Sequence, residues 1–413
     1  MRFTAMLALC ASGVPVLAQS PNTAALVVVV VDQTGAVVPG AQVTVVNTAT
    51  GARRETTAGS NGSVTIAGLQ LTGTYKVSVS KAGFTTEDIQ DVALRAGETA
   101  SVRVKLMASG GRSDVTVYGT TAGVRAGPEL GTRLDSETID ETPILSRKIS
   151  ALPLLNASFR QAKGTGDLFL NSVYFVTGAG GRRQADFVVD GATGDEPWGR
   201  QTMFATIPVG AVQEMNVMSR AFSAEFGWTS SAAINIVTKA GTNATRGEAL
   251  VLGRLGAMQA DAFSADLQCT PSVPTCAAPT ANGGAVAIVP PDIPDSLGQG
   301  SFALGGPIAR DRTHYFAAMD FTHQDRTAPI TTPLVPAGTT IVGRYRQALV
   351  DARVDHKMND RHSLMVRGNL DRFYDTNPQD AVSGNVLPGA GRQFTRHAYG
   401  AQINTRRSFR RRC

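Results

Sequence analysis

Apolar and polar residues alternate along much of the chain, and this pattern predicts β-strands. Between residues 22 and 107 a period of two is clear in 75–80 and 101–106, where one face is apolar and the other is polar. Turn signals separate the runs of this segment: Asp32-Gln-Thr-Gly35, Pro39-Gly40, Asn61-Gly62 and Gly97-Glu98. About seven strands in such a length predict a two-sheet β-sandwich.

The alternation returns after residue 247 in longer runs. Small and apolar residues at 348, 350, 352 and 354 alternate with Leu349, Asp351, Arg353 and Asp355, and the same holds for 363–371 and 399–404. A transmembrane barrel strand needs one face for lipid and one for a watery lumen. A soluble sandwich with one solvated face would show the same pattern, so these strands alone leave both interpretations open. No apolar run reaches the roughly 18 residues of a membrane-spanning helix.

Composition fits a folded protein of two or three domains. The chain has 413 residues, of which 42% are hydrophobic and 17% are charged, and these values exclude wholesale disorder. The net charge of +6 first suggests a nucleic-acid partner. Five arginines, however, lie within the last eight residues, and without them 34 basic residues face 33 acidic ones. We therefore expect no nucleic acid as a partner.

The N-terminus has the layout of a secretory signal peptide over residues 1–18. Met1-Arg2 supplies a positive charge, a short apolar stretch follows, and Ala18 offers a small residue at the cleavage site. A lipoprotein signal is not favoured, because Leu9 precedes Cys10 where a small residue is required. The protein is therefore expected to be exported.

Cys269 and Cys276 lie in a loop rich in Pro, Ala and Gly. In an exported protein such a pair can oxidise, so we predict a small loop disulfide, with two free thiols as the alternative. A metal site is not expected, since no Cys-x-x-Cys occurs and the nearest histidine is His314. The sequence predicts no cofactor.

The segment 22–107 also resembles a known family through the order of its residues. The residues that carry the resemblance are Val31-Asp32-Gln-Thr-Gly-Ala-Val-Val-Pro39-Gly40-Ala41, Asn47-Thr-Ala-Thr-Gly51, Gly73-Thr-Tyr75 and Ala82-Gly83-Phe84. They are similar to the carboxypeptidase-regulatory-like, transthyretin-like domain. The resemblance implies an accessory module without catalytic groups.

A second resemblance covers residues 119–240. Its ordered pieces are Leu152-Pro153-Leu154, Gly181 to Gly191, Val212 to Val217, Ala224-Glu225-Phe226-Gly227 and Ala233 to Asn243. Together they are similar to the plug domain of TonB-dependent outer-membrane receptors, and the module in front points to the Oar-like subgroup. The resemblance implies an α+β plug inside a barrel lumen. The expected fold class is therefore mainly β, with a transthyretin-like sandwich, a plug, and an incomplete antiparallel transmembrane β-barrel over 241–413.

A hinge and a short β-prone segment occupy residues 108–118. After Ser109-Gly110-Gly111-Arg112 come Asp114, Val115, Thr116, Val117 and Tyr118. An extended segment on a tether can add as a strand to a partner's sheet, and in the family the TonB box stands at this place. Asp114 to Tyr118 are therefore the candidate TonB box, and an ordinary first strand of the next domain is the alternative.

The polar residues of the plug are expected to serve fold and packing rather than substrate contact. Asp190-Gly191 is a β-turn signal after an apolar run. Ion pairs of Arg182 and Arg183 with Glu214 and Glu225, or of these residues with the barrel wall, would explain their charges. The substrate-binding residues are unknown from sequence.

The barrel region is shorter than the family resemblance requires. A barrel of about 22 strands with about 10 residues each needs roughly 220 residues in strands. Only 173 residues run from Gly241 to Cys413, and the chain ends on Arg406-Arg-Ser-Phe-Arg-Arg-Arg-Cys413. We expect a truncated or out-of-frame end, with a functional basic tail as the alternative.

Enzymatic chemistry is not expected. The five histidines do not form His-Glu-x-x-His, and neither a Gly-x-Ser-x-Gly elbow nor a phosphate-binding loop occurs. The resemblance implies an outer-membrane receptor with its sandwich in the periplasm, which takes up an unknown bulky substrate with the TonB energy-transducing complex and outer-membrane lipid as partners. The alternative is a secreted or surface-exposed adhesion protein that binds carbohydrate or peptide without transport.

Overall fold

The computed structural model describes most of the chain in two compact units. It describes residues 22–109, 131–142, 147–161, 174–176, 185–194, 206–219, 226, 232–256, 295–330, 334–335, 339–359, 362–376, 387–391 and 393–407. One unit comprises residues 1–46 with 53–126, and the other comprises 47–52 with 127–413. The predicted signal peptide lies outside the described residues.

The N-terminal unit is a β-sandwich of two sheets. Its strands are β1 (Ala24–Val31), β2 (Gln42–Asn47), β3 (Arg53–Thr57), β4 (Ser63–Leu69), β5 (Tyr75–Ser80), β6 (Glu87–Val92) and β7 (Thr99–Lys105). One sheet has the order β4-β1-β7 and the other β3-β2-β5-β6. β1 is antiparallel to β4 and parallel to β7. The predicted two-sheet sandwich is confirmed.

Alternate residues of these strands fill the space between the two sheets. Val28, Val43 and Val77 are fully buried, and each fully buried valine stabilises the fold by about 1.5–3 kcal/mol. Glycines in the connecting turns have positive φ, such as Gly35 at 87° and Gly62 at 69°. This backbone conformation is one that glycine adopts without steric cost, which explains the turn signals in the sequence.

The second unit contains a five-stranded mixed sheet, which we call the plug sheet. Its order is β12-β11-β14-β13-β8, with β8 (Gly131–Asp135), β11 (Ala185–Val189), β12 (Ala192–Thr193), β13 (Val212–Ser219) and β14 (Ala232–Thr238). Beside it lie α2 (Ser136–Glu141), η3 (Ile149–Leu155), η4 (Val209–Ala211) and the pair β9 (Phe159–Gln161) and β10 (Tyr174–Val176). In the described part of the chain, no helix is long and apolar enough to cross a membrane.

The plug sheet packs one face against these helices. Phe187, Met215 and Ile234 on the sheet and Ile139 and Leu152 on the helices belong to one buried cluster. β14 lies between parallel β11 and antiparallel β13, and all its residues are buried. A central strand that is covered on both faces has a largely apolar sequence, and β14 follows this rule apart from Asn235 and Thr238.

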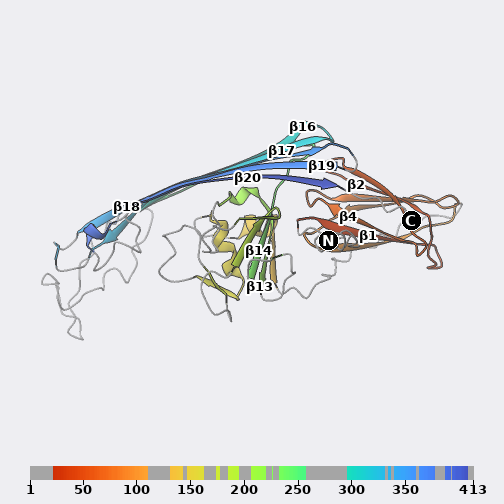
Figure 1. Ribbon diagram of the computed structural model, residues 1–413, viewed down its shortest axis with the longest axis horizontal. Helices are drawn as coiled ribbons and strands as arrows, with labels where there is room; N and C mark the ends of the chain where they lie inside the picture. The colour runs from red at the N-terminus through yellow and green to blue at the C-terminus, as the bar shows by residue number, and fades with distance from the viewer. Residues whose placement is uncertain are drawn as a thin grey trace, which may run out of the picture. The chain divides into compact units, whose positions relative to one another are not determined.

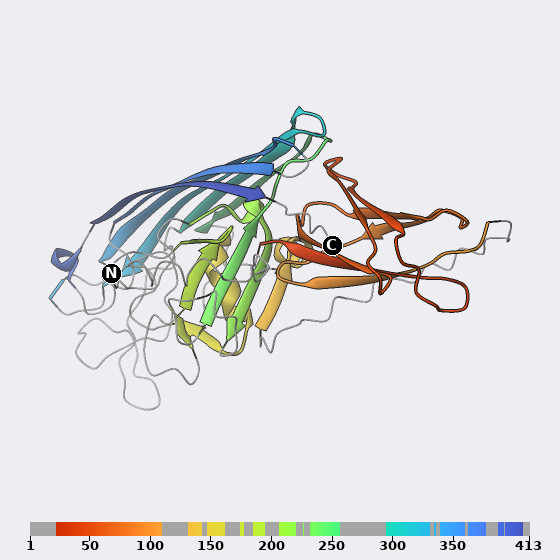
Figure 2. The ribbon, with the colours of Figure 1, turned by 45° about the vertical axis from the view of Figure 1, so that its right-hand side comes forward.

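The remaining strands form a single antiparallel sheet, which we call the wall. They are β15 (Arg246–Leu255), β16 (Ser296–Ala309), β17 (Thr313–Pro329), β18 (Thr340–Lys357), β19 (His362–Thr376) and β20 (Gln393–Arg407), and each pairs with the next. In Figures 1 and 2 the wall, coloured green at β15 and cyan to blue from β16 to β20, curves around one side of the plug sheet. Among the described residues β15 and β20 are edge strands, so the wall is open. This confirms the expected fold class of an incomplete antiparallel barrel.

Side chains of the wall are sorted in the reverse of the usual order. On β18 the side chains of Gln347, Asp351 and Arg353 are buried, whereas Val342 and Val354 on the opposite face are exposed. The same sorting holds on β20, where Tyr399 and Ile403 are exposed. The alternation in the sequence therefore places charged residues toward the plug and apolar residues away from it.

Candidate functional site

Several residues singled out in the sequence lie outside the part that the structure describes. They are the candidate TonB box from Asp114 to Tyr118, the cysteines Cys269 and Cys276, and the plug residues Arg182, Arg183 and Glu225. Their roles stay predictions. The arrangement that the structure does describe is a charged contact between the plug sheet and the wall.

Asp190 places a carboxylate at the end of the plug sheet that faces the wall. It forms with Gly191 the turn between β11 and β12, and the φ angles of the two residues are 48° and 82°. A two-residue hairpin turn with positive φ at both positions favours Asp-Gly, which explains the turn predicted from the sequence. The Asp190 carboxylate accepts hydrogen bonds from Thr238 N at 3.0 Å and from Thr238 Oγ1 at 2.6 Å.

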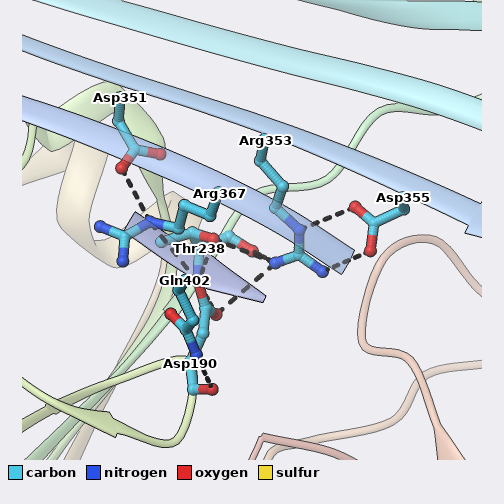
Figure 3. Close-up of polar contacts among 7 residues, drawn as sticks. All are labelled: Asp190, Thr238, Asp351, Arg353, Asp355, Arg367 and Gln402. Carbon is cyan, nitrogen blue, oxygen red and sulfur yellow. Dashed lines mark hydrogen bonds and ion pairs between the residues drawn. The ribbon is translucent and has the colours of Figure 1, made fainter. Parts of the chain in front are cut away.

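Two arginines of the wall reach the same carboxylate (Figure 3). Arg353 Nη1 lies 3.5 Å from Asp190 Oδ1, and Arg367 Nε lies 3.7 Å from Asp190 Oδ2. The arginine side chains are 6% exposed and that of Asp190 is 2% exposed. Buried charges need paired charges, so the position of Asp190 between two guanidinium groups is favourable.

Each arginine also has an aspartate partner on the wall itself. Arg353 donates Nε to Asp355 Oδ2 at 2.7 Å and Nη2 to Asp355 Oδ1 at 2.9 Å, which makes a bidentate pair. Arg367 donates Nε to Asp351 Oδ1 at 2.8 Å. The wall therefore neutralises its own arginines.

Two hydrogen bonds complete this contact. Arg353 Nη1 donates to the backbone oxygen and to Oγ1 of Thr238, both at 3.0 Å. Gln402 Nε2 donates to the backbone oxygen of Asp190 at 2.9 Å. We call this set the Asp190 cluster; its members are Asp190, Thr238, Asp351, Arg353, Asp355, Arg367 and Gln402.

Carboxylates of the wall also hold the segment that leads into β13. Thr206 N donates to Asp371 Oδ2 at 3.0 Å, and Val209 N donates to Asp320 Oδ2 at 3.0 Å. Asp371 is fully buried and also pairs with Arg396. Backbone amides of the plug thus donate hydrogen bonds to carboxylates of the wall, and one of these, Asp371, is also paired with an arginine of the wall.

Asn243 lies in the segment that connects the plug sheet to the wall, and its side chain contacts two residues of the wall. Its Oδ1 accepts a hydrogen bond from Asp311 N at 2.8 Å and lies 2.8 Å from His314 Nε2, and its Nδ2 donates to Asp311 Oδ1 at 2.6 Å. Two residues earlier, Gly241 lies so close to the backbone of Tyr315 that no Cβ would fit. The chain therefore leaves the plug along a fixed path.

Glu214 makes an ion pair inside the plug. Its Oε1 lies 3.0 Å from Arg133 Nε on the neighbouring strand β8, and it accepts a hydrogen bond from Asn216 Nδ2 at 3.0 Å. Glu214 therefore forms its ion pair within its domain, whereas Arg182 and Arg183, which were expected beside it, lie outside the described residues. The partner, Arg133, was not identified from the sequence.

The arginines of the Asp190 cluster were recognised in the sequence only as the polar side of alternating strands. The available signal was the regular spacing of Asp351, Arg353 and Asp355 on one face of a strand whose other face is apolar. Within the described ranges, no group of three His, Cys, Asp or Glu could hold a metal ion. The Asp190 cluster holds the plug sheet against the wall by ion pairs and hydrogen bonds.

The N-terminal sandwich matches a protein-family model. Residues 25–107 match the family described as carboxypeptidase regulatory-like domain. A comparison with curated proteins finds no match to this sequence.

Three solved structures illustrate what the chain is similar to. The outer membrane transporter YddB from Escherichia coli aligns with a TM-score of 0.50 and 13% identity, covering 68% of this chain and 37% of that one. A mutant of the ferric enterobactin receptor PfeA from Pseudomonas aeruginosa aligns with a TM-score of 0.46 and 14% identity, covering 69% and 39%. FpvA of P. aeruginosa, bound to heterologous pyoverdines, aligns with a TM-score of 0.45 and 12% identity, covering 69% and 32%.

The chain spans less than two fifths of the length of each of these three proteins. The similarity to YddB concerns the fold, and it agrees with the plug and the wall described above. The chain therefore combines a segment similar to the carboxypeptidase regulatory-like domain with a plug sheet and wall whose fold is similar to that of the outer membrane transporter YddB.

Proposed function

We propose that the chain is part of an outer-membrane receptor that takes up a bulky substrate with energy relayed by TonB, and that it has no enzymatic role. The observation that carries this proposal is the reversed sorting of side chains on the wall. Asp351, Asp371 and Asp375 are fully buried on the plug-facing side, whereas Ile403 is 73% exposed and Tyr399 is 63% exposed on the other.

This sorting favours a hydrocarbon environment for the outer face of the wall. In water, a large contiguous apolar surface promotes association, and soluble monomers rarely carry one. In a bilayer the same face is stabilised, and the charged face is protected by the plug. A secreted adhesin has no need for this arrangement, so the receptor is preferred.

The connections of the wall suggest its orientation. β16 and β17 are separated only by 310–312, and β18 and β19 only by 358–361, whereas the connections at the opposite end are longer. In outer-membrane barrels short turns face the periplasm and longer loops face outside. The Asp190 cluster, near the ends of β18 and β14, would then lie toward the periplasm, where we also place the sandwich.

We propose that energy reaches the plug through the segment from Asp114 to Tyr118. Strand addition works through main-chain hydrogen bonds and places little demand on side chains. The partner would be the periplasmic domain of TonB, which pairs with this segment along an extended edge.

Fractionation tests the location. We expect the chain to sediment with outer membranes and to resist extraction by urea. Recovery of the native protein from culture fluid, with no outer-membrane pool, would overturn the receptor in favour of the adhesin.

Binding to purified TonB periplasmic domain tests the energised step. Proline cannot donate a ladder hydrogen bond, so Val115→Pro with Val117→Pro should weaken binding at least about tenfold. The matched control, Val115→Thr with Val117→Thr, keeps the backbone donors and should bind as the wild type does. Equal binding by the proline and threonine variants would refute the role of this segment.

A further inference from the structure

The Asp190 carboxylate lies in a site formed by two arginines from another part of the fold. Arg353 and Arg367 occupy paired positions on β18 and β19, and both guanidinium groups are within 4 Å of this carboxylate. Arginine presents a planar fork of donors that matches a carboxylate. Two such forks on neighbouring strands make a surface suited to one oxyanion.

The arginines do not depend on Asp190 for their neutralisation. Arg353 forms a bidentate pair with Asp355, and Arg367 donates a hydrogen bond to Asp351, and both aspartates belong to the wall. Within the Asp190 cluster, the two positive charges of Arg353 and Arg367 are balanced by the two negative charges of Asp351 and Asp355. Displacement of the plug would therefore leave the arginines ordered and paired.

Both arginines have donors to offer a ligand. Arg367 Nη2 is buried and has no hydrogen-bond partner in the described part of the chain. Arg353 Nη1 donates hydrogen bonds to Thr238, which belongs to the plug sheet, and the same nitrogen lies 3.5 Å from Asp190 Oδ1. Movement of the plug sheet would free this second donor beside the first.

Asp190 also has hydrogen-bond partners within the plug sheet. Its carboxylate keeps the backbone amide and the hydroxyl of Thr238 as donors inside the plug sheet. Removing one partner of a buried pair is costly when it strands the other charge. Here each side keeps hydrogen-bond partners of its own, which lowers the cost of separating the plug sheet from the wall.

We propose that Arg353 and Arg367 form a binding site for a carboxylate group of the substrate, which Asp190 occupies while the plug is docked. This inference rests on the proposed function, because the plug must move before a solute reaches the wall. A carboxylate on the transported molecule would replace Asp190 between the two guanidinium groups. The preferred substrates are therefore acidic, with at least one accessible carboxylate.

Formate, a small carboxylate, is the probe for this site. The Asp190→Gly variant removes the carboxylate that occupies the site in the wild-type chain. Glycine accepts the positive φ of position 190, so the turn is kept while the carboxylate is lost. In the purified full chain in detergent, formate should raise the Tm of Asp190→Gly saturably by about 2 °C relative to chloride at equal ionic strength. The isosteric Asp190→Asn variant fills the position without a charge and should show no such rise.

A second substitution assigns the effect to the arginines. In the Asp190→Gly background, Arg367→Gln should abolish the saturable rise in Tm. Persistence of the rise in that double variant, or an equal rise in chloride, would overturn the proposal.

The wild-type chain supplies a measurement that does not depend on the folding of a variant. Formate should compete with Asp190 and accelerate hydrogen exchange of residues 185–193 at least about twofold over chloride, and an unchanged rate counts against the site. These outcomes are independent of outer-membrane location and of TonB binding. A failure of the receptor function is therefore distinguishable from a failure of the carboxylate site.

Discussion

Arg353 and Arg367 face each other as a directly paired, buried couple of like charges on β18 and β19. Like charges at opposed positions of a sheet are destabilising on their own. Asp351 and Asp355 flank the couple on the wall, and Asp190 meets it from the plug. The arginine couple is therefore one of the contacts that join the plug sheet to the wall.

Loss of Arg353 should destabilise the docked plug. Arg353→Gln strands the buried Asp355 and removes the donor to Thr238, so we expect the free energy of unfolding to fall by about 3 kcal/mol. Urea unfolding of the purified chain in detergent measures the change. The matched control is Arg346→Gln on the same strand, because the Arg346–Asp325 pair is part-exposed and should cost less than about 1 kcal/mol. Equal losses in the two variants would show that the cluster has no special role.

A charge on the outer face of the wall should block membrane insertion. Ile403→Arg places a guanidinium on the apolar face, which costs about 2–4 kcal/mol near the middle of a bilayer. Asn404→Arg, one residue along, places it on the plug-facing side and should be tolerated far better. The fraction of protein that resists urea extraction from outer membranes measures the difference, and equal fractions would argue against a lipid-facing surface.

A methyl group at position 241 should disturb the passage from plug to wall. The Cβ of Gly241→Ala would collide with the backbone of Tyr315, and such overpacking typically costs about 1–3 kcal/mol. Gly253→Ala serves as control, because its Cβ would meet no atom within 4 Å. Thermal unfolding should separate the two variants, and a normal Tm for Gly241→Ala would contradict the tight contact.

The sandwich should lose stability in acid through two surface carboxylates. Hydrogen bonds from Thr34 hold the pKa of Asp32 below its usual range, and the Lys76 ammonium does the same for the pKa of Asp88. Both groups favour the folded state when ionised. Their contribution is present above the unfolded pKa of about 3.9 and is lost as the pH falls through the lower folded values.

The isolated segment 22–107 is suited to this measurement, because it forms a sandwich with its own core. Asp88→Asn should flatten the decline of Tm between pH 5 and the acid limit by a small amount, since an exposed pair contributes less than about 1 kcal/mol. Glu87→Gln, on the same strand, is the control. An unchanged decline in Asp88→Asn would remove this carboxylate from the explanation.

Local patterns in the sequence were sufficient to predict the strands and several of the turns. Alternation separated the apolar face of β18 and β20 from the charged face, because a period of two is a property of neighbouring residues, but it did not decide which face is exposed. The Asp190-Gly191 turn was predicted for the same reason, since a hairpin with two positive φ angles selects this dipeptide.

Local patterns could not predict which residues from distant parts of the chain contact one another. Asp190 and Arg353 are 163 positions apart, and no local rule connects a turn residue of one sheet with a strand residue of another. The ion pair of Glu214 with Arg133 depends on β8 lying beside β13, a pairing that the sequence did not reveal. Contacts that form the candidate site thus required the three-dimensional arrangement.

The strand order of the plug sheet implies a mechanical sequence. β8 comes first in the chain and lies at the edge of the sheet, where β13 is its neighbour. β14 lies further inside and leads directly to Asn243, which is bound to the wall. A pull from the N-terminal side of Gly131 would load the ladder between β8 and β13 before any contact of β14. The plug would accordingly unravel from its free edge while its last strand stays tethered, and it could refold on that tether once the load is released.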